Sequence, residues 1–349
     1  MKINHPENND AEGEPPPCLR VGVTYNIKKN IPSALPDAEA EADNEETIGA
    51  IQNVLEAAGH TVILFEAASE LPSRLLEEKP DIVFNIAEGI NGRGREAQVP
   101  AILNFLRIPF TGSDETTMCV SMDKALCKKI VSALGICTPP YMVARFGAPL
   151  KDLNLDFPLI IKPNSEGSSK GISDCSVVND EGELRRVLEE KLDAYRQDML
   201  IEEYIQGREF TVGLLGNGER LRIFPPMEII FKDKAHSIYS YEVKRNFGEY
   251  VRYECPPDLN SALRKEIENS SETIYRFLQC RDMARMDFRL SRESKLHFME
   301  VNPLPGLAPE YSDLPIIAAF CGMDHASLIR YILDSALERY GMPCNTKQG

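Results

Sequence analysis

The sequence of 349 residues contains no tryptophan, and aromatic residues make up only 7% of it. Its nine cysteines form no Cys-x-x-Cys pair, which argues against a zinc site or a disulfide framework and favours a reducing compartment. No stretch approaches the ~18 apolar residues of a membrane-spanning helix, and the N-terminus lacks the apolar segment of a secretory signal. We therefore expect a cytoplasmic protein without a membrane partner.

Basic residues are also scarce. There are 39 Lys and Arg against 54 Asp and Glu, a formal net charge of -15. A nucleic-acid-binding protein needs a clustered basic face, so a nucleic-acid partner is not expected, although a few converging lysines could still bind phosphate groups locally. The apolar fraction of 43% is enough for a sizeable core, and the length predicts more than one domain.

Two common phosphate-binding motifs are missing. There is no GxxxxGK[ST] P-loop, and no GxGxxG follows the first apolar stretch, LRVGVTY at 19–25. Further strand patterns at 61–66 and 81–87 alternate with helix patterns, which predicts a doubly wound parallel sheet in the N-terminal part. A single helix is expected from Met122 to Gly135.

Two late strand patterns, ARMDFRL at 284–290 and LHFMEVN at 296–302, are joined by a short polar turn and should pair antiparallel. Because side chains alternate along a strand, one surface of this hairpin would carry Asp287, Glu300 and Asn302 with Arg285 beside them. Carboxylate and amide oxygens are the ligands that Mg²⁺ selects, and the ion would in turn hold nucleotide phosphates. The alternative is an ordinary hairpin with its polar face in water.

Lys162 ends an almost entirely apolar strand, 157–161, and a lysine in that place needs an anionic partner. The loop that follows, NSEGSSKG, is made of small residues whose backbone N–H groups can approach phosphate oxygens. A flexible surface loop is the alternative. Further residues could face the phosphates or ribose of a nucleotide, or simply water: Lys124, Lys244, Glu202, Glu203 and Glu209.

Taken in order, the motifs resemble those of the ATP-grasp superfamily and, within it, the D-alanine–D-alanine ligase family. The matching segments lie between about 108 and 315: GSDETTMCVSMDK, FPLIIKPNSEGSSKGI, MLIEEYIQGREFTVGLLG, YEVKRN, ARMDFRL and MEVNPLPGLAPEYSDLP. The resemblance implies an α/β protein of ATP-grasp architecture, in which two α+β subdomains enclose ATP after the N-terminal parallel sheet. The expected parts are a disordered tail 1–17, an N-terminal domain 18–112, a central subdomain 113–209 and a C-terminal subdomain 210–349 with the metal site.

The resemblance also implies an activity. A ligase of this family transfers the γ-phosphoryl group of ATP to a substrate carboxylate and joins the resulting acyl phosphate to an amine. It implies ATP and Mg²⁺ (or Mn²⁺) as cofactors, amino acids or small peptides as substrates, a homodimer, and a place in peptidoglycan biosynthesis. A ligase for another amino acid or peptide, or a regulatory nucleotide-binding protein without turnover, remain alternatives.

Roles follow by position from the same resemblance. The nucleotide site comprises Lys124 and Lys162 for the phosphates, Glu202 with the backbone of Glu203 and Ile205 for adenine, Glu209 for ribose, and Lys244. Metal binding falls to Asp287, Glu300 and Asn302. The catalytic positions are Arg285 and the Gly306 N–H for the oxyanion, and Ser168 for holding the loop closed.

The substrate region departs from the family pattern. Arg245 stands where a tyrosine is common and would favour an anionic group. Ser312, which matches a serine for the second substrate's carboxylate, is followed by Asp313 instead of an apolar residue, and an aspartate there suits a cationic group. Other residues of unassigned role are Glu41, Glu45 and Glu46 as candidates for the substrate ammonium, and Glu88, Arg93, Arg95 and Glu96, which could line the substrate side or form an exposed charged loop.

Overall fold

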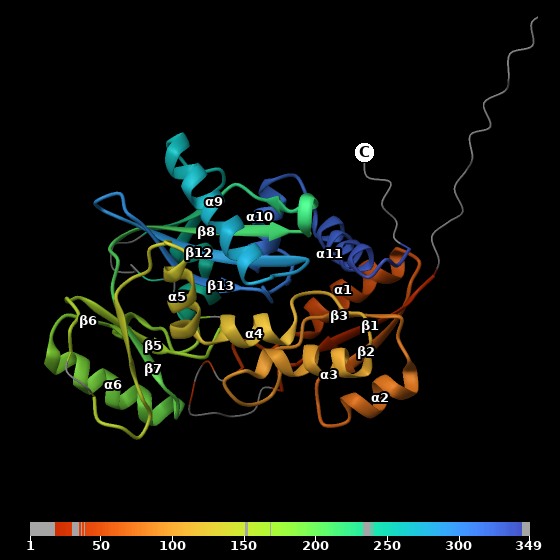
Figure 1. Cartoon of the computed structure of the whole chain (residues 1–349), viewed down its shortest axis with the longest axis horizontal. Helices are drawn as coiled ribbons and strands as arrows, with labels where there is room; N and C mark the ends of the chain where they lie inside the picture. The colour runs from red at the N-terminus through yellow and green to blue at the C-terminus, as the bar shows by residue number, and fades with distance from the viewer. Residues whose placement is uncertain are drawn as a thin grey trace, which may run out of the picture.

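In the computed structural model, the described residues are 18–29, 35, 37, 39–150, 153–167, 169–232, 238 and 240–343. The expected tail 1–17 and the loop serine Ser168 lie outside them. The strands form three separate sheets (Figure 1).

The first sheet is parallel, as the alternating pattern predicts, with strand order β2-β1-β3. Its strands are β1 (Arg20–Tyr25), β2 (Thr61–Glu66) and β3 (Ile82–Asn85). The connecting helices are α1 (Glu45–Ala57), α2 (Leu71–Glu78) and α3 (Gln98–Leu106). All four residues of β3 are buried, which explains its continuous apolar sequence.

The second sheet has the order β4-β7-β5-β6 and is antiparallel. It comprises β4 (Tyr141–Ala144), β5 (Leu159–Pro163), β6 (Val177–Val178) and β7 (Met199–Glu203). Apolar side chains of α6 (Glu181–Tyr195) join those of β5 and β7 in one core. Every residue of β5 is buried, Lys162 included, so that lysine has to find its partner inside the protein.

The third sheet has six strands, ordered β11-β10-β8-β12-β13, with β9 paired to β8. The strands are β8 (Gly207–Leu215), β9 (Arg222–Ile223), β10 (Met227–Phe231), β11 (Val251–Glu254), β12 (Met283–Ser291) and β13 (Leu296–Asn302). β12 and β13 pair antiparallel, as predicted, with Arg285 opposite Asn302 and Asp287 opposite Glu300. The polar ends of both strands therefore lie side by side.

The helix expected from about Met122 to Gly135 is confirmed as α5 (Lys124–Ala133). A separate helix that was not expected, α4 (Glu115–Met122), precedes it and is separated from it at Asp123. Asp123 is extended (φ -86, ψ 95), and its carboxylate accepts the N–H of Leu126, so it caps a new helix. Lys124 consequently occupies the first position of α5.

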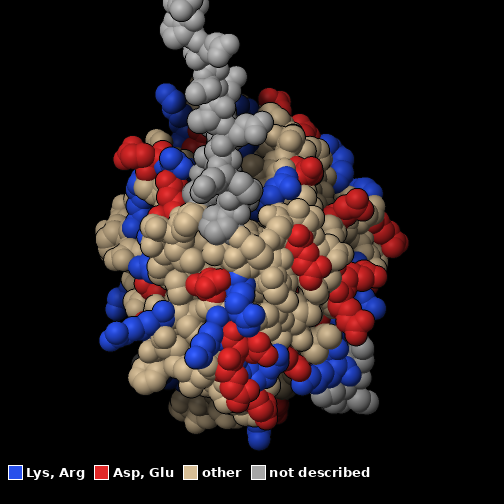
Figure 2. Space-filling view, turned by 90° about the vertical axis from the view of Figure 1, so that its right-hand side faces the viewer, with Lys and Arg blue, Asp and Glu red and all other residues tan. Residues whose placement is uncertain are grey.

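The remaining helices follow the third sheet or connect its strands: α7 (Tyr241–Arg245), α8 (Phe247–Tyr250), α9 (Ser261–Phe277), α10 (Asp313–Phe320) and α11 (His325–Arg339). Side chains of α10 and α11 share a core with β1 and α1, so the end of the chain returns to the first sheet (Figure 1). Among the described residues, no single helix is long and apolar enough to cross a membrane. Only α10 and α11 together meet that criterion, and they are bent by 107°. Acidic and basic side chains are interspersed on the face that Figure 2 shows.

Candidate active site

The ends of β12 and β13 bring the predicted metal-site residues together. Arg285 donates from Nε and Nη2 to the two oxygens of Asp287, at 3.1 and 2.8 Å. Asn302 donates from its amide nitrogen to Glu300 Oε1 at 3.5 Å, which leaves its amide oxygen as the atom that could bind a cation. The hairpin thus presents two carboxylates and an amide oxygen on one surface, as the alternation of the strands predicts.

A lysine from a different element, helix α5, completes this cluster. Lys124 is buried, and its Nζ lies 3.2 Å from Glu300 Oε2 and 2.5 Å from the backbone oxygen of Glu166. Burial raises the pKa of Glu300, but Lys124, Lys162 and Arg285 outweigh it, and the pKa lies well below its usual value. For Asp287, burial dominates over the partly opposing Arg285 and raises the pKa. A cation between these carboxylates would relieve that cost.

Lys162 reaches a buried carboxylate. Its Nζ lies 2.6 Å from Glu202 Oε1, while the Nζ of Lys128 lies 3.1 Å from Glu202 Oε2. Both Glu202 and Lys128 have no exposed surface. Glu202 therefore faces neither water nor open space in this structure, in contrast to the alternatives left open by the sequence.

The loop after Lys162 is held by the acidic N-terminal segment. Gly167 donates its N–H to Glu41 at 2.5 Å, and Arg95 donates to both oxygens of Glu41. Arg95 also donates to the backbone oxygen of Ser165 at 2.8 Å and lies 3.0 Å from Glu166. A Cβ at position 167 would lie 2.9 Å from Glu41 Oε1, so a larger residue there would require the Glu41 carboxylate to shift.

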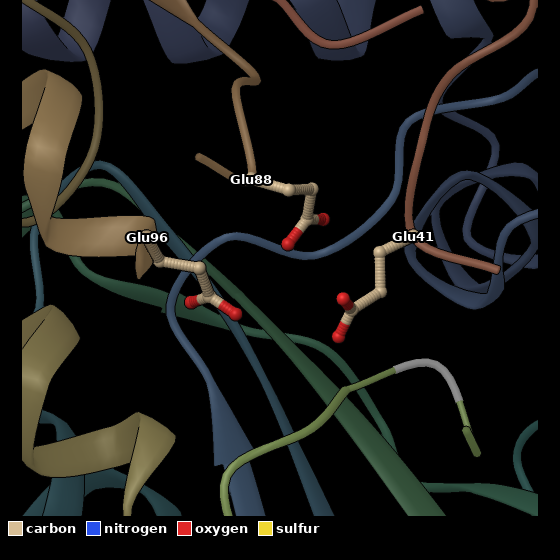
Figure 3. A group of neighbouring side chains, drawn as sticks. All are labelled: Glu41, Glu88 and Glu96. Carbon is tan, nitrogen blue, oxygen red and sulfur yellow. The ribbon is translucent and has the colours of Figure 1, made fainter. Parts of the chain in front are cut away.

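A cavity of about 540 Å³ lies beside the hairpin and receives side chains from all parts of the chain. The carboxylates of Glu41, Glu88 and Glu96 line it, point toward one another (Figure 3) and come within 4.8 Å of one another. Burial and the neighbouring carboxylates raise the pKa of Glu88 well above its usual value and that of Glu96 to about 7. This wall of the cavity is suited to a cationic group.

The structure separates the other acidic and basic candidates of the N-terminal part. Glu45 and Glu46 are exposed in the first turn of α1, where they face the positive end of the helix. Arg93 is mostly exposed, with its Nη1 3.4 Å from Asp123. Glu88 and Glu96 line the cavity and Arg95 is buried, so among these four residues the alternative of an exposed charged loop describes only Arg93.

The lining of the cavity also includes Arg285, Gly306, Ser312 and Asp313. Asp313 is 2% exposed, and its Oδ2 lies 3.3 Å from Nη1 of Arg285, so the cation that it meets is part of the protein. Ser312 Oγ accepts the N–H of Ala308 at 3.2 Å, and a Cβ added to Gly306 would come within 2.7 Å of that Oγ. A larger residue at 306 would therefore require the Ser312 hydroxyl to shift.

Two further predicted residues lie at the end of α7. Arg245 is exposed at the end of α7 and borders the cavity. Lys244, beside it, also borders the cavity, and burial lowers its pKa although Asp313 opposes the shift.

The predicted adenine and ribose residues lie along β7 and β8. Glu203 accepts the N–H of Asp156 at 3.1 Å, and Ile205 is half-buried just beyond β7. Glu209 lies 3.7 Å from Arg289, and burial raises its pKa while Arg289 opposes the shift. Glu203, Ile205 and Glu209 therefore lie where β7 of the second sheet leads into β8 of the third.

Comparison with known proteins decides the family. A family model described as the D-alanine–D-alanine ligase C-terminus matches residues 130–334. A D-alanine–D-alanine ligase from Aquifex aeolicus is 39% identical over 290 residues, covering 81% of this chain and 92% of the relative. The chain belongs to the D-alanine–D-alanine ligase family. An uncharacterized protein from Sinorhizobium fredii is 33% identical over 294 residues, covering 82% of this chain and 86% of that one.

A solved structure supports the same fold. The D-alanine–D-alanine ligase from Bacillus anthracis complexed with ATP has a TM-score of 0.73 with this chain at 24% identity, covering 93% of this chain and 99% of that one. This likeness confirms the expected ATP-grasp architecture. Together with its curated relatives, it identifies the protein as an ATP-grasp ligase that forms a carbon–nitrogen bond.

Proposed function

We propose that this ligase joins two amino acids in a reaction that depends on ATP and Mg²⁺, and that the β12–β13 hairpin holds the metal. One observation carries the proposal. Asp287 and Glu300 are paired across the hairpin, with Lys124 and Arg285 on either side of them. This group offers both the anionic oxygens that a cation needs and the cationic groups that a triphosphate needs.

The residues fit a magnesium ion. Glu300 is held ionised by its lysine and arginine neighbours, and the raised pKa of Asp287 reflects burial beside a second carboxylate. With the amide oxygen of Asn302, they form an all-oxygen donor set, which Mg²⁺ prefers; Mn²⁺ could replace it. When bound, the ion would neutralise charge on the nucleotide phosphates. The protein's own residues account for the remaining steps.

Lys124 and Lys162 bind the phosphates of ATP in this proposal, with Lys244 as a further contact and with Glu203, Ile205 and Glu209 around adenine and ribose. Glu202, which is buried between Lys128 and Lys162, does not touch the nucleotide. A substrate carboxylate oxygen attacks the γ-phosphorus, which forms an acyl phosphate and releases ADP. The amine of the second substrate then attacks the acyl carbon, an amide bond forms, and inorganic phosphate leaves. Catalysis of this kind consists mainly of positioning and charge neutralisation.

The charge that develops during the second step is placed on the acyl oxygen. Arg285 makes pairs with Asp287 and Asp313 that fix its guanidinium at the cavity wall, and Gly306 lies on the same wall. We assign the stabilisation of this oxyanion to Arg285 and the Gly306 N–H. Removing one such donor typically lowers the rate by ~10²–10³. Ser168 is proposed to help hold the loop closed.

For the first substrate, we propose that the ammonium group binds between Glu88 and Glu96. Glu41 is a weaker candidate because Arg95 and the Gly167 N–H already occupy its oxygens. D-alanine is the first candidate because the curated relatives bear its name. An amino acid with a second amine is the alternative, because two carboxylates exceed what one ammonium requires.

The second substrate would bind near Arg245 and Ser312, with its carboxylate on the arginine. With D-alanine in both sites, the product would serve peptidoglycan biosynthesis in the cytoplasm. The proposal includes a homodimer and no nucleic-acid or membrane partner, on the strength of the family resemblance and the acidic composition.

An assay of Mg²⁺-dependent ADP release tests the proposal. The purified chain is incubated with ATP and with D-alanine, L-amino acids, diamino acids or small dipeptides, and products are identified by mass spectrometry. We expect ADP release only with Mg²⁺ or Mn²⁺ and with an amino acid, together with a dipeptide product. Nucleotide binding without ADP release under any condition would instead support a regulatory protein without turnover.

A further inference from the structure

Helix α5 provides two buried lysines one turn apart, on the same helix face. Lys124 lies 3.2 Å from Glu300 of the hairpin, and Lys128 lies 3.1 Å from Glu202 of β7. Lys124 has a role in the proposed function, but Lys128 has none. Nothing in the sequence distinguishes Lys128 from its neighbour Lys129, since both are lysines in a helical segment.

Glu202 is fully buried between two cations, Lys128 and Lys162. A buried carboxylate is strongly destabilising unless it is paired, whereas one pair is enough to neutralise it. The group of three therefore contains one positive charge more than Glu202 needs. One of the two lysines is available for a further anion.

The surroundings of the two lysines show which one is available. Lys162 lies at the end of β5, and the loop that follows contacts Lys124 through the backbone oxygens of Asn164 and Glu166, at 3.0 and 2.5 Å. Because Lys124 pairs with Glu300, Lys162 lies beside the proposed phosphate and metal region. The second contact of Lys128 is the backbone oxygen of Phe298 in β13, at 3.4 Å, and its side chain has no exposed surface. Lys128 is thus enclosed between α5, β7 and β13.

We propose that Lys128 is a positioning residue for ATP: it remains the counter-ion of Glu202 when Lys162 turns to the nucleotide phosphates. Without Lys128, binding ATP through Lys162 would leave Glu202 buried without a cation. This inference rests on the proposed role of Lys162 as a phosphate ligand. It adds a residue that touches neither substrate nor metal but sets the affinity for nucleotide.

The test compares Lys128→Met with Lys129→Met, because Lys129 is the adjacent, exposed lysine of the same helix. Binding of a non-hydrolysable ATP analogue with Mg²⁺ is measured by titration calorimetry, and folding is checked by thermal unfolding. We expect K128M to weaken analogue binding by about ten- to a hundredfold. K129M should bind the analogue like the wild type.

A double variant separates charge compensation from a packing role. In K128M/E202Q the carboxylate that needs a partner is gone, so we expect analogue affinity to recover most of the loss seen in K128M. If K128M does not fold, a folded double variant with near wild-type affinity supports the proposal equally.

Different results of these binding experiments contradict different proposals. Wild-type affinity in K128M, or a loss that E202Q fails to relieve, would overturn the positioning role while leaving the ligase proposal intact. A double variant that does not fold would also overturn it, because Lys128 would then serve packing alone. A wild-type chain that binds no ATP analogue would contradict the proposed function itself.

Discussion

Carboxylates of the same chemical type behave oppositely within this site. Glu300 lies beside Lys124, and its pKa is well below the usual range, although burial acts in the other direction. Glu96 lies beside Glu41 and Glu88, and burial together with the charge of Glu41 raises its pKa to about 7. Glu300 therefore suits a permanently bound cation, whereas Glu88 and Glu96 suit a cationic substrate that binds and is then released.

Glu96→Gln should change how stability depends on pH. A carboxyl whose pKa is raised on folding contributes stability below its unfolded pKa, and this contribution is lost as the pH rises through about 7. Burial and the charge of Glu41 raise this pKa. Arg95, Lys124 and a hydrogen bond with Glu88 lower it. The variant should therefore be more stable than the wild type at pH 8, on the order of 1 kcal/mol, with little difference at pH 4.5.

Urea unfolding at the two pH values measures this difference, with Glu189→Gln on the exposed face of α6 as the control. Equal stability of wild type and E96Q at both pH values would show that the Glu41, Glu88 and Glu96 cluster does not titrate as described.

Asp313→Asn should alter acceptor binding. The Asp313 carboxylate is buried beside Ser312 and repels the carboxylate of an incoming amino acid, although Arg285 partly neutralises it. Removing the charge should lower KM for the acceptor about three- to tenfold. Since Arg285 loses one of its anchors, kcat should fall. Steady-state kinetics check this, with D258N at an exposed position as the control, and an unchanged KM would count against Asp313 at the acceptor site.

At the scale of elements, the acidic N-terminal segment and the glycine-rich loop form one unit. Arg95 links them, because it donates to Glu41 of the segment and to the backbone of Ser165 in the loop. Lys124 connects the same loop to Glu300 through its bond to the Glu166 backbone. The loop position is thus coupled to the proposed metal site.

Arg95→Met should loosen this loop. It leaves Glu41 and Glu166 without their shared arginine, and we expect faster amide hydrogen exchange at 164–171 and a higher KM for ATP, by about tenfold. Arg93→Met removes an arginine two residues away that is 80% exposed, and it should change neither quantity. Identical exchange in R95M and wild type would contradict the coupling.

The elements that could be predicted from the sequence are those with a strong local pattern. Alternation along β12 and β13 was enough to place Asp287 and Glu300 on one surface of the hairpin, because pairing of a short hairpin is local. The register that puts them opposite each other comes from the structure. The contacts of Glu41 and Lys128 could not be predicted, because each joins segments that are far apart in the chain. Glu41 lies in a loop without periodicity, and Lys128 is one of several similar lysines. Helix α4 was missed because its apolar and polar residues are not separated onto two faces of a helix.

At the scale of the whole molecule, helix α11 connects the first sheet to the third. Arg339 of α11 lies 2.7 Å from Asp282, which has no exposed surface and also accepts the N–H of Gly112. The guanidinium also donates to the backbone oxygen of Phe110 at 2.8 Å. Residues at the end of the chain thereby hold the segment that follows the first sheet.

Arg339→Met should destabilise the protein as a whole. It leaves the buried Asp282 carboxylate without its cation, at a cost of about 3 kcal/mol. Denaturant unfolding measures the change, and Arg330→Met on the exposed side of α11 should cost little. A loss in R339M no larger than that in R330M would refute the role of this pair.

In the proposed function, the hairpin carboxylates hold the metal on which ATP turnover depends. Mg²⁺-dependent ADP release by Glu300→Gln, compared with the wild type on the substrate that the wild type uses, tests it most directly. We expect turnover to be abolished while the thermal unfolding transition is retained, because the change removes a charge that Lys124 and the metal share. Wild-type turnover by a folded E300Q protein would contradict the account.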